Sequence, residues 1–175
     1  FIGGILEHAR ALSAIVAPTI NSYKRLKPHY EAPVYLCWGK ENRSALIRIP
    51  YYTKGKEWEG ERRIEVRFPD PTCNPYLAFS VIVAAGLDGI KNKIDPGDPI
   101  DSSVYSMSES ELKRMGIKSL PGSLEEALDE MESDELIKRV LGDYLMEKYL
   151  DAKREEIKEF RDQITLWEYL KYLHY

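Results

Sequence analysis

The sequence has few cysteines and no long apolar run. Its 175 residues include only two cysteines, Cys37 and Cys73. Two cysteines cannot build a disulfide framework, so we expect a reducing, cytoplasmic setting. No apolar stretch approaches the roughly 20 residues that cross a bilayer, and no basic-then-apolar leader is present, so we expect no membrane partner. A Walker loop, a GxGxxG turn and a nucleophile elbow are also missing, which leaves those chemistries unsupported.

Charge is unevenly distributed along the chain. Residues 1–70 carry 12 basic and 8 acidic side chains, a net charge of +4. Residues 123–175 carry 8 basic and 15 acidic side chains, a net charge of −7, and the whole chain has a formal charge of −4. An acidic balance argues against nucleic acid as the partner. The basic first third favours a small anionic ligand instead.

The apolar periodicity predicts helices at both ends and strands between them. It predicts a helix from the start of the chain to Pro18, an ordered loop over 21–33, and strands over 34–38, 45–49 and 62–68. Asn74 and Pro75 predict the start of a helix that continues to about Ile90. The remainder reads as helical. Three capping boxes are predicted: Ser108 with Glu111, Ser123 with Glu126, and Thr165 with Glu168.

These elements predict an α+β fold, with an antiparallel sheet segment, flanking helices and a helical C-terminal tail. We assign residues 1–122 to the helix, strands, second helix and loop of one domain, and residues 123–175 to the helical tail of the same domain. The terminal TLWEYLKYLHY places Leu166, Trp167, Leu170 and Leu173 on one stripe. This stripe either folds back onto the chain's own core or forms an interface with a partner.

The alternation in RRIEVRF places Arg63, Glu65 and Arg67 on one strand face. The simpler interpretation is a solvated face with cross-strand ion pairs. The functional interpretation is a carboxylate that binds a hard metal ion, flanked by guanidiniums that bind anions. Arg43 and Arg48, on or just before the preceding strand, would then bring four arginines towards one surface. One glutamate rarely completes a magnesium site, so further ligands must come from elsewhere.

Several spaced motifs carry a resemblance to a known family. NSYKRLKPHYEAPVYLCWGKENRSALIRIP and RRIEVRFPDPTCNPYLAFSVIVAAGLDGIKNKI resemble the C-terminal half of the catalytic domain of type I glutamine synthetase. The likeness continues through PIDSSVYSMSESE and LPGSLEEALDEME to the end of the chain. The resemblance implies an ATP-dependent ligase that makes glutamine from glutamate and ammonia through γ-glutamyl phosphate, with Mg²⁺ or Mn²⁺. It also implies a homo-oligomer, a dodecamer of two hexameric rings.

The resemblance implies a role for each matching position. Arg25, Glu31 and Arg67 correspond to glutamate-binding residues; Arg43, Arg48 and Arg63 to contacts with the ATP phosphates; Glu65 to a metal ligand; and Glu31 and Arg43 to the catalytic residues. Lys54 or Lys56 could substitute for a lysine on the ATP side of the family's site. Tyr105 lies where one branch of the family carries a modified tyrosine, although YSMSESE resembles the unmodified branch.

The family's β-grasp domain, catalytic histidine and most metal-binding glutamates would precede Phe1. We therefore expect this chain to be inactive alone. Two alternatives stay open: a ligase of the same superfamily that joins glutamate to polyamine-type amines, and a non-catalytic assembly module. A carboxylate at Glu31 suits an ammonium ion better than a bulky amine, which favours ammonia.

Overall fold

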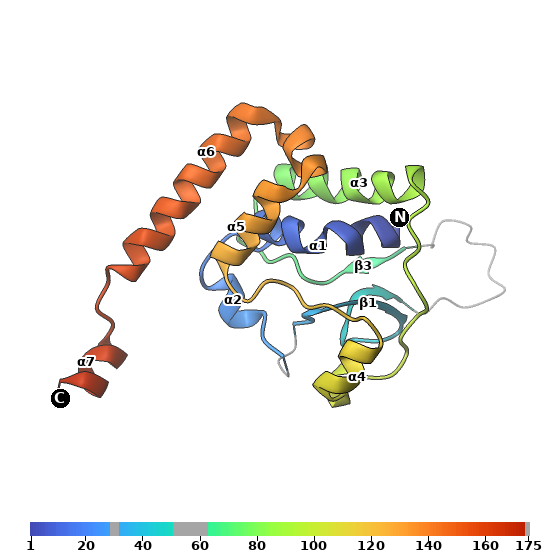
Figure 1. The fold of residues 1–175 in the computed structure, drawn as a ribbon, viewed down its shortest axis with the longest axis horizontal. Helices are drawn as coiled ribbons and strands as arrows, with labels where there is room; N and C mark the ends of the chain where they lie inside the picture. Colours follow the sequence, from blue (N-terminus) through green and yellow to red (C-terminus); the bar gives the residue numbers. More distant parts are fainter. Residues whose placement is uncertain (29–31, 51–62, 174–175) are drawn as a thin grey trace.

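The computed structural model describes residues 1–28, 32–50 and 63–173 of the chain (Figure 1). Its elements are α1 (Ile2–Val16), α2 (Ser22–Arg25), β1 (Tyr35–Lys40), β2 (Ala45–Ile49), β3 (Glu65–Val66), α3 (Pro75–Lys91), η1 (Val104–Ser106), α4 (Glu109–Arg114), α5 (Leu124–Ser133), α6 (Glu135–Arg161) and α7 (Leu166–Tyr172). The predicted α+β class is confirmed. A small sheet with flanking helices leads into a helical C-terminal tail.

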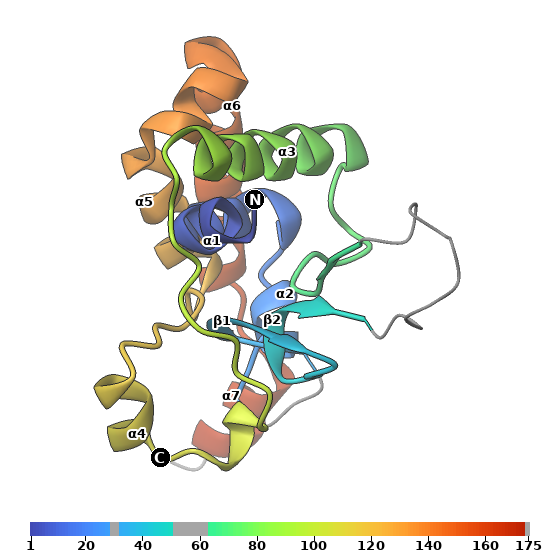
Figure 2. The same ribbon diagram turned by 90° about the vertical axis from the view of Figure 1, so that its right-hand side faces the viewer.

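Helix α1 lies at the centre of the molecule. It runs beside α3 on one side and over the sheet on the other, and α5 packs against it as well (Figures 1 and 2). The close approach of α1 and α3 depends on glycine. A Cβ at Gly4 would lie 2.0 Å from the carbonyl oxygen of Ala85 and 2.6 Å from the nitrogen of Gly89. Any larger residue at position 4 would push the two helices apart.

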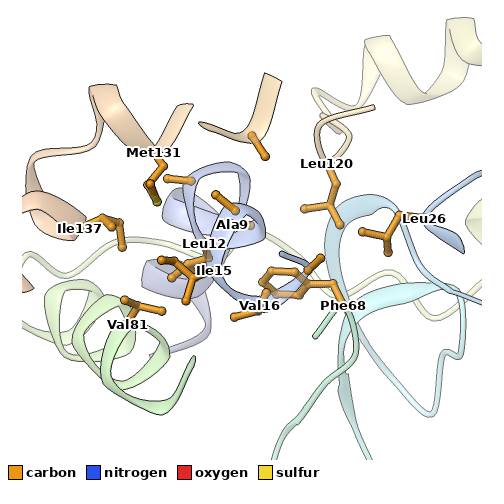
Figure 3. Packing of buried hydrophobic residues seen from close by; sticks show 14 of the residues in the cluster. Ala9, Leu12, Ile15, Val16, Leu26, Phe68, Val81, Leu120, Met131 and Ile137 are labelled. Atoms are coloured by element: carbon orange, nitrogen blue, oxygen red, sulfur yellow. The ribbon is translucent and has the colours of Figure 1, made fainter. Parts of the chain in front are cut away.

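The hydrophobic core gathers around α1. Leu12, Ile15 and Val16 are almost completely buried, and they meet side chains from the sheet, α3, α5 and α6 (Figure 3). Phe68, which follows β3, has no exposed surface and is the largest of the fully buried side chains. Burying a phenylalanine of this kind stabilises a fold by roughly 1.5–3 kcal/mol. The core therefore fixes the end of β3 against α1, next to the residues of greatest interest.

The sheet corrects one part of the prediction. The strand order is β1-β2-β3, and β2 pairs with β3 in the antiparallel sense as expected, but β1 and β2 are parallel. The segment 41–44 does not form a tight hairpin. Instead it returns along β1, because Glu41 adopts a left-handed φ of 56° and Asn42 is hydrogen-bonded to residues 100 and 102.

The helix signals are largely confirmed. The Asn74 side chain accepts hydrogen bonds from the backbone N–H groups of Tyr76 and Leu77, with Pro75 in the first turn. The capping boxes at Ser108 and Thr165 are both present. The box at Ser123 is incomplete, because the Glu126 carboxylate instead accepts from the Gly122 N–H and pairs with Arg10. The short helix α2 also forms inside the segment that was predicted as a loop.

The tail extends away from the body of the molecule (Figure 1). Gly142 interrupts α6 with a left-handed φ of 73°, and α7 follows at the far end with no buried residue. Its stripe is well exposed: Leu166 by 73%, Trp167 by 63% and Leu170 by 65%. The interpretation that this stripe folds back onto its own core is therefore wrong. None of the described helices is both long enough and apolar enough to cross a membrane.

One histidine connects three helices. His8 on α1 places Nδ1 2.6 Å from an oxygen of Asp134, the N-cap of α6, and Nε2 3.4 Å from an oxygen of Asp88 on α3. The hydrogen bond to Asp134 raises the pKa of His8 above 6.5, although burial opposes this. Burial alone would raise the pKa of Asp134, but hydrogen bonds from His8 and the backbone lower it overall. The charged pair therefore holds α6 against α1.

We predict that this contact makes stability depend on pH. The contribution of protonated His8 is complete below pH 6.5, its ordinary pKa, and is lost as pH rises through the higher pKa of the folded chain. Urea unfolding at a series of pH values should show this loss, and His8→Gln should remove it and cost roughly 1.5–3 kcal/mol in mildly acidic buffer. Asp88→Asn, which affects the longer contact with His8 and a hydrogen bond with Asn92, should cost less. Equal pH dependence in His8→Gln and the parent chain would contradict the prediction.

Candidate active site

The β2–β3 pair brings one carboxylate between two guanidiniums. Arg48 and Glu65 are direct partners across the two strands. Arg48 Nη1 lies 2.9 Å from Glu65 Oε2, and Arg67 Nε donates a hydrogen bond of 3.3 Å to Glu65 Oε1. Because Glu65 and Arg67 are two residues apart in an extended segment, their side chains lie on the same face. We call Arg48, Glu65 and Arg67 the arginine–glutamate cluster.

The cluster is not a freely solvated face. The predicted cross-strand ion pair is present, but the side chains of Arg67 and Arg48 are only 15% and 25% exposed. Arg67 Nη1 also donates to the Ala45 carbonyl oxygen at 3.4 Å, and Arg48 Nε is buried with no hydrogen-bond partner in the described part of the chain. Two largely buried guanidinium groups thus share one carboxylate. The surplus positive charge makes this face suited to binding an anion.

The other predicted arginines are related to the cluster either by a contact with its backbone or by their position in the sequence. Arg25 Nη2 donates a 2.7 Å hydrogen bond to the carbonyl oxygen of Phe68, the residue after Arg67. Arg43 is exposed and lies two residues before Ala45, whose carbonyl Arg67 contacts. Arg63 is exposed two residues before Glu65. Within the described residues, the side chains of Arg43 and Arg63 form no hydrogen bond or ion pair.

Three predicted residues cannot be located. Glu31, Lys54 and Lys56 lie outside the described residues, so their roles stay predictions.

The fit of a divalent metal to these residues is partial. The carboxylate of Glu65 is 43% exposed and offers hard oxygen ligands, as Mg²⁺ and Mn²⁺ require. However, no group of three or more His, Cys, Asp or Glu side chains with ligand geometry occurs in the described ranges. Within the described residues, Glu65 is the one predicted metal ligand, and that role stays a prediction. The expectation that further ligands must come from elsewhere stays a prediction.

Two features of the site were not predicted. The phenol of Tyr105 lies near Arg67: burial raises the pKa of Tyr105, and the positive charge of Arg67 opposes that rise. The second feature is the buried amide of Asn42, which is hydrogen-bonded to a segment about 60 residues later in the chain. In the sequence, Asn42 is an asparagine in a polar segment between two strands. Asparagine is common in turns of every kind, so this position gave no sign of the long-range contact.

Cys37 is one of the two free cysteines of the chain. It is buried in β1, and burial raises the pKa of its thiol to about 11. The thiolate is the nucleophilic form of cysteine, and it is scarce at neutral pH with such a pKa. Packing is therefore the role of this residue. Cys73 is also a free cysteine with a raised pKa.

The fold and the site together define an α+β domain in which two arginines hold one glutamate on a small sheet. Residues 1–172 match the family model described as glutamine synthetase, catalytic domain. The chain therefore belongs to the glutamine synthetase catalytic-domain family, as the resemblance in its motifs indicated.

Known proteins of similar sequence and structure support this assignment. The chain is 61% identical to a glutamine synthetase of Sulfolobus acidocaldarius over 90% of its length, and 53% identical to one of Methanocaldococcus jannaschii over 100%. It covers only 33% and 37% of those relatives, so it corresponds to a fragment of them. A solved structure titled as a GmaS/ADP complex superposes on 99% of the chain, with a TM-score of 0.83 and 34% identity, while the chain covers 39% of that structure.

Proposed function

We propose that this chain is part of an ATP-dependent glutamate–ammonia ligase, and that it supplies contacts to glutamate, to the ATP phosphates and to a divalent metal. The observation that carries the proposal is the arginine–glutamate cluster, in which two guanidiniums share one carboxylate at 2.9 and 3.3 Å in a domain of this family. A site for carboxylate and phosphate groups requires more positive than negative charge on partly buried side chains.

The reaction has two steps. A γ-carboxylate oxygen of glutamate forms a bond to the γ-phosphorus of ATP, while the bond to the bridging oxygen of ADP breaks. Ammonia, formed when an ammonium ion gives up a proton, then attacks the carbon of the phosphorylated γ-carboxyl group. The bond from that carbon to the phosphate oxygen breaks, and the phosphate leaves with the proton that the nitrogen loses, which gives glutamine. In phosphoryl transfer, enzymes act mainly by positioning the groups and stabilising their charge. A set of arginines can do both without forming a covalent bond.

The role of each residue follows from the resemblance of its position to the family's site. We assign Arg48 and Arg63 to the ATP phosphates, Arg25 and Arg67 to the carboxylate groups of glutamate, and Arg43 to the transferring phosphoryl group. Arg43 and Arg63 are exposed, as residues that meet a ligand need to be. Glu31 would bind the ammonium ion and take up its proton. The solved structure with ADP in its title supports a nucleotide site in proteins of this shape.

Glu65 is the one residue here that we assign to the metal. A bound Mg²⁺ or Mn²⁺ would supply positive charge beside the ATP phosphates. Arg48 and Arg67 each contact one oxygen of the Glu65 carboxylate, so they fix its orientation. The remaining ligands would come from the parts of the longer protein that this chain lacks.

The ligase proposal is tested with the full-length protein that carries this sequence. We expect ATP-dependent release of phosphate that requires glutamate and is faster with ammonia than with polyamines, and glutamine should form in equal amount to the phosphate. The 175-residue chain alone should show no turnover, because it covers only about a third of the relatives' length. Faster turnover with a polyamine would indicate the amine ligase instead. No glutamate-dependent turnover with any amine would support the assembly module.

A further part of the proposal is that the full-length protein is a cytoplasmic homo-oligomer of two hexameric rings. The exposed tail supports the contact between the rings. Helix α7 carries a stripe of leucine and tryptophan side chains that no described residue covers, and the rings of Trp167 and Tyr172 form an edge-to-face pair with centroids 5.8 Å apart. A large apolar surface of this kind on an extended arm is typical of an interface. We assign it to contact with the opposite ring.

Deleting residues 165–175 from the full-length protein tests this assignment. The rings should separate, because the deletion removes the exposed apolar stripe, while each subunit stays folded since α7 contributes no buried residue. Light scattering at decreasing protein concentration should show a mass about half that of the parent assembly. Substituting Lys171, on the same helix, with alanine provides a control that keeps the apolar stripe. An unchanged mass at low concentration in the deletion variant would contradict the assignment.

A further inference from the structure

The turn that carries Arg43 is fixed by two buried polar neighbours. Asn42 is 6% exposed and Ser44 is 3% exposed, whereas Arg43 between them is exposed. The Ser44 backbone N–H and hydroxyl both donate to the side-chain oxygen of Asn42, at 2.8 and 2.6 Å. The backbone on both sides of Arg43 is therefore anchored in the interior while its side chain faces out.

Asn42 also connects this turn to a distant part of the chain. Its amide nitrogen donates to the carbonyl oxygens of Ile100 and Ser102, at 2.6 and 2.8 Å. An asparagine side chain has two donor hydrogens and an oxygen with two acceptor sites, and all four are used here. The Ser44 hydroxyl in turn accepts a 2.9 Å hydrogen bond from the Val104 N–H. We refer to residues 97–104 as the strap.

The strap is held firmly along β1, so it is a rigid support. The Ile100 N–H donates to the Trp38 carbonyl at 2.8 Å, and the Lys40 N–H donates to the Asp101 carboxylate at 2.8 Å. The contact is so close that a Cβ at Gly39 would lie 2.1 Å from the Ile100 oxygen. A turn anchored to such a support has little freedom to move.

We propose that Asn42 is a positioning residue for Arg43: it fixes the turn against the strap so that the Arg43 guanidinium meets the transferring phosphoryl group in one orientation. This inference rests on the proposed function of Arg43. A guanidinium on a loose turn would lose the fixed geometry on which charge stabilisation depends. The bond pattern predicts which change is harmful. Asn42→Asp keeps the oxygen that accepts from Ser44 but replaces both donors with an oxygen that faces two carbonyls.

A double-mutant cycle in the full-length enzyme separates positioning from general stability. Asn42→Ala and Asn42→Asp should each lower kcat for glutamine formation about tenfold to a hundredfold. Arg43→Ala should lower kcat at least as much. In the Arg43→Ala background, Asn42→Ala should change kcat less than about twofold, because there is no longer a guanidinium to position. Thermal unfolding identifies the folded variants; if neither Asn42 variant folds, Ser44→Ala replaces them in the cycle.

Trp38→Phe is the matched control. It removes the 2.9 Å hydrogen bond that the Trp38 indole donates to the Gly97 carbonyl at the other end of the strap. The hydrogen bonds of Asn42 stay intact. Its effect on kcat should be small and should multiply with that of Arg43→Ala. If the effects of Asn42→Ala and Arg43→Ala multiply instead, Asn42 has only a structural role and the inference is wrong, while the proposed function stands. If Arg43→Ala leaves kcat unchanged, both the role of Arg43 and the positioning inference are wrong.

Discussion

The carboxylate of Glu65, held between Arg48 and Arg67, is the interaction on which the site depends. Removing it would leave two largely buried guanidinium groups without a shared partner. Two positive charges that are close together repel each other unless an anion lies between them. The cluster is therefore stable only with a carboxylate inside it or an anion beside it. This property links the fold of β2 and β3 to a chemistry of phosphate and carboxylate groups.

The hydrophobic core supports the cluster from beneath. Phe68 is fully buried against α1, so the residue next to Arg67 cannot move without disturbing the interior. The Arg25 guanidinium donates to the Phe68 carbonyl on the same segment. Arginines placed on a short strand would be mobile by themselves, and here their backbone is anchored by packing. This arrangement lets a small sheet present several cations in fixed positions.

The sequence was sufficient to predict the features that depend on local pattern. Alternation in RRIEVRF predicted that Glu65 and Arg67 share a face, and Asn74 predicted the start of α3, because both signals act over a few residues. The parallel pairing of β1 with β2 was not predicted, since it depends on bonds between Asn42 and residues about 60 positions away. The solvent exposure of α7 was left open for a similar reason. An apolar stripe predicts burial without indicating which surface covers it.

Locating the metal is the most direct test of the account. The full-length protein, crystallised with Mn²⁺ and a non-hydrolysable ATP analogue, would show the ion by its anomalous scattering. We predict a manganese ion about 2.1 Å from a Glu65 carboxylate oxygen, beside the analogue's phosphates, with Arg48 and Arg67 still in contact with that carboxylate. A metal ion bound elsewhere, with Glu65 in contact only with the two arginines, would contradict the account.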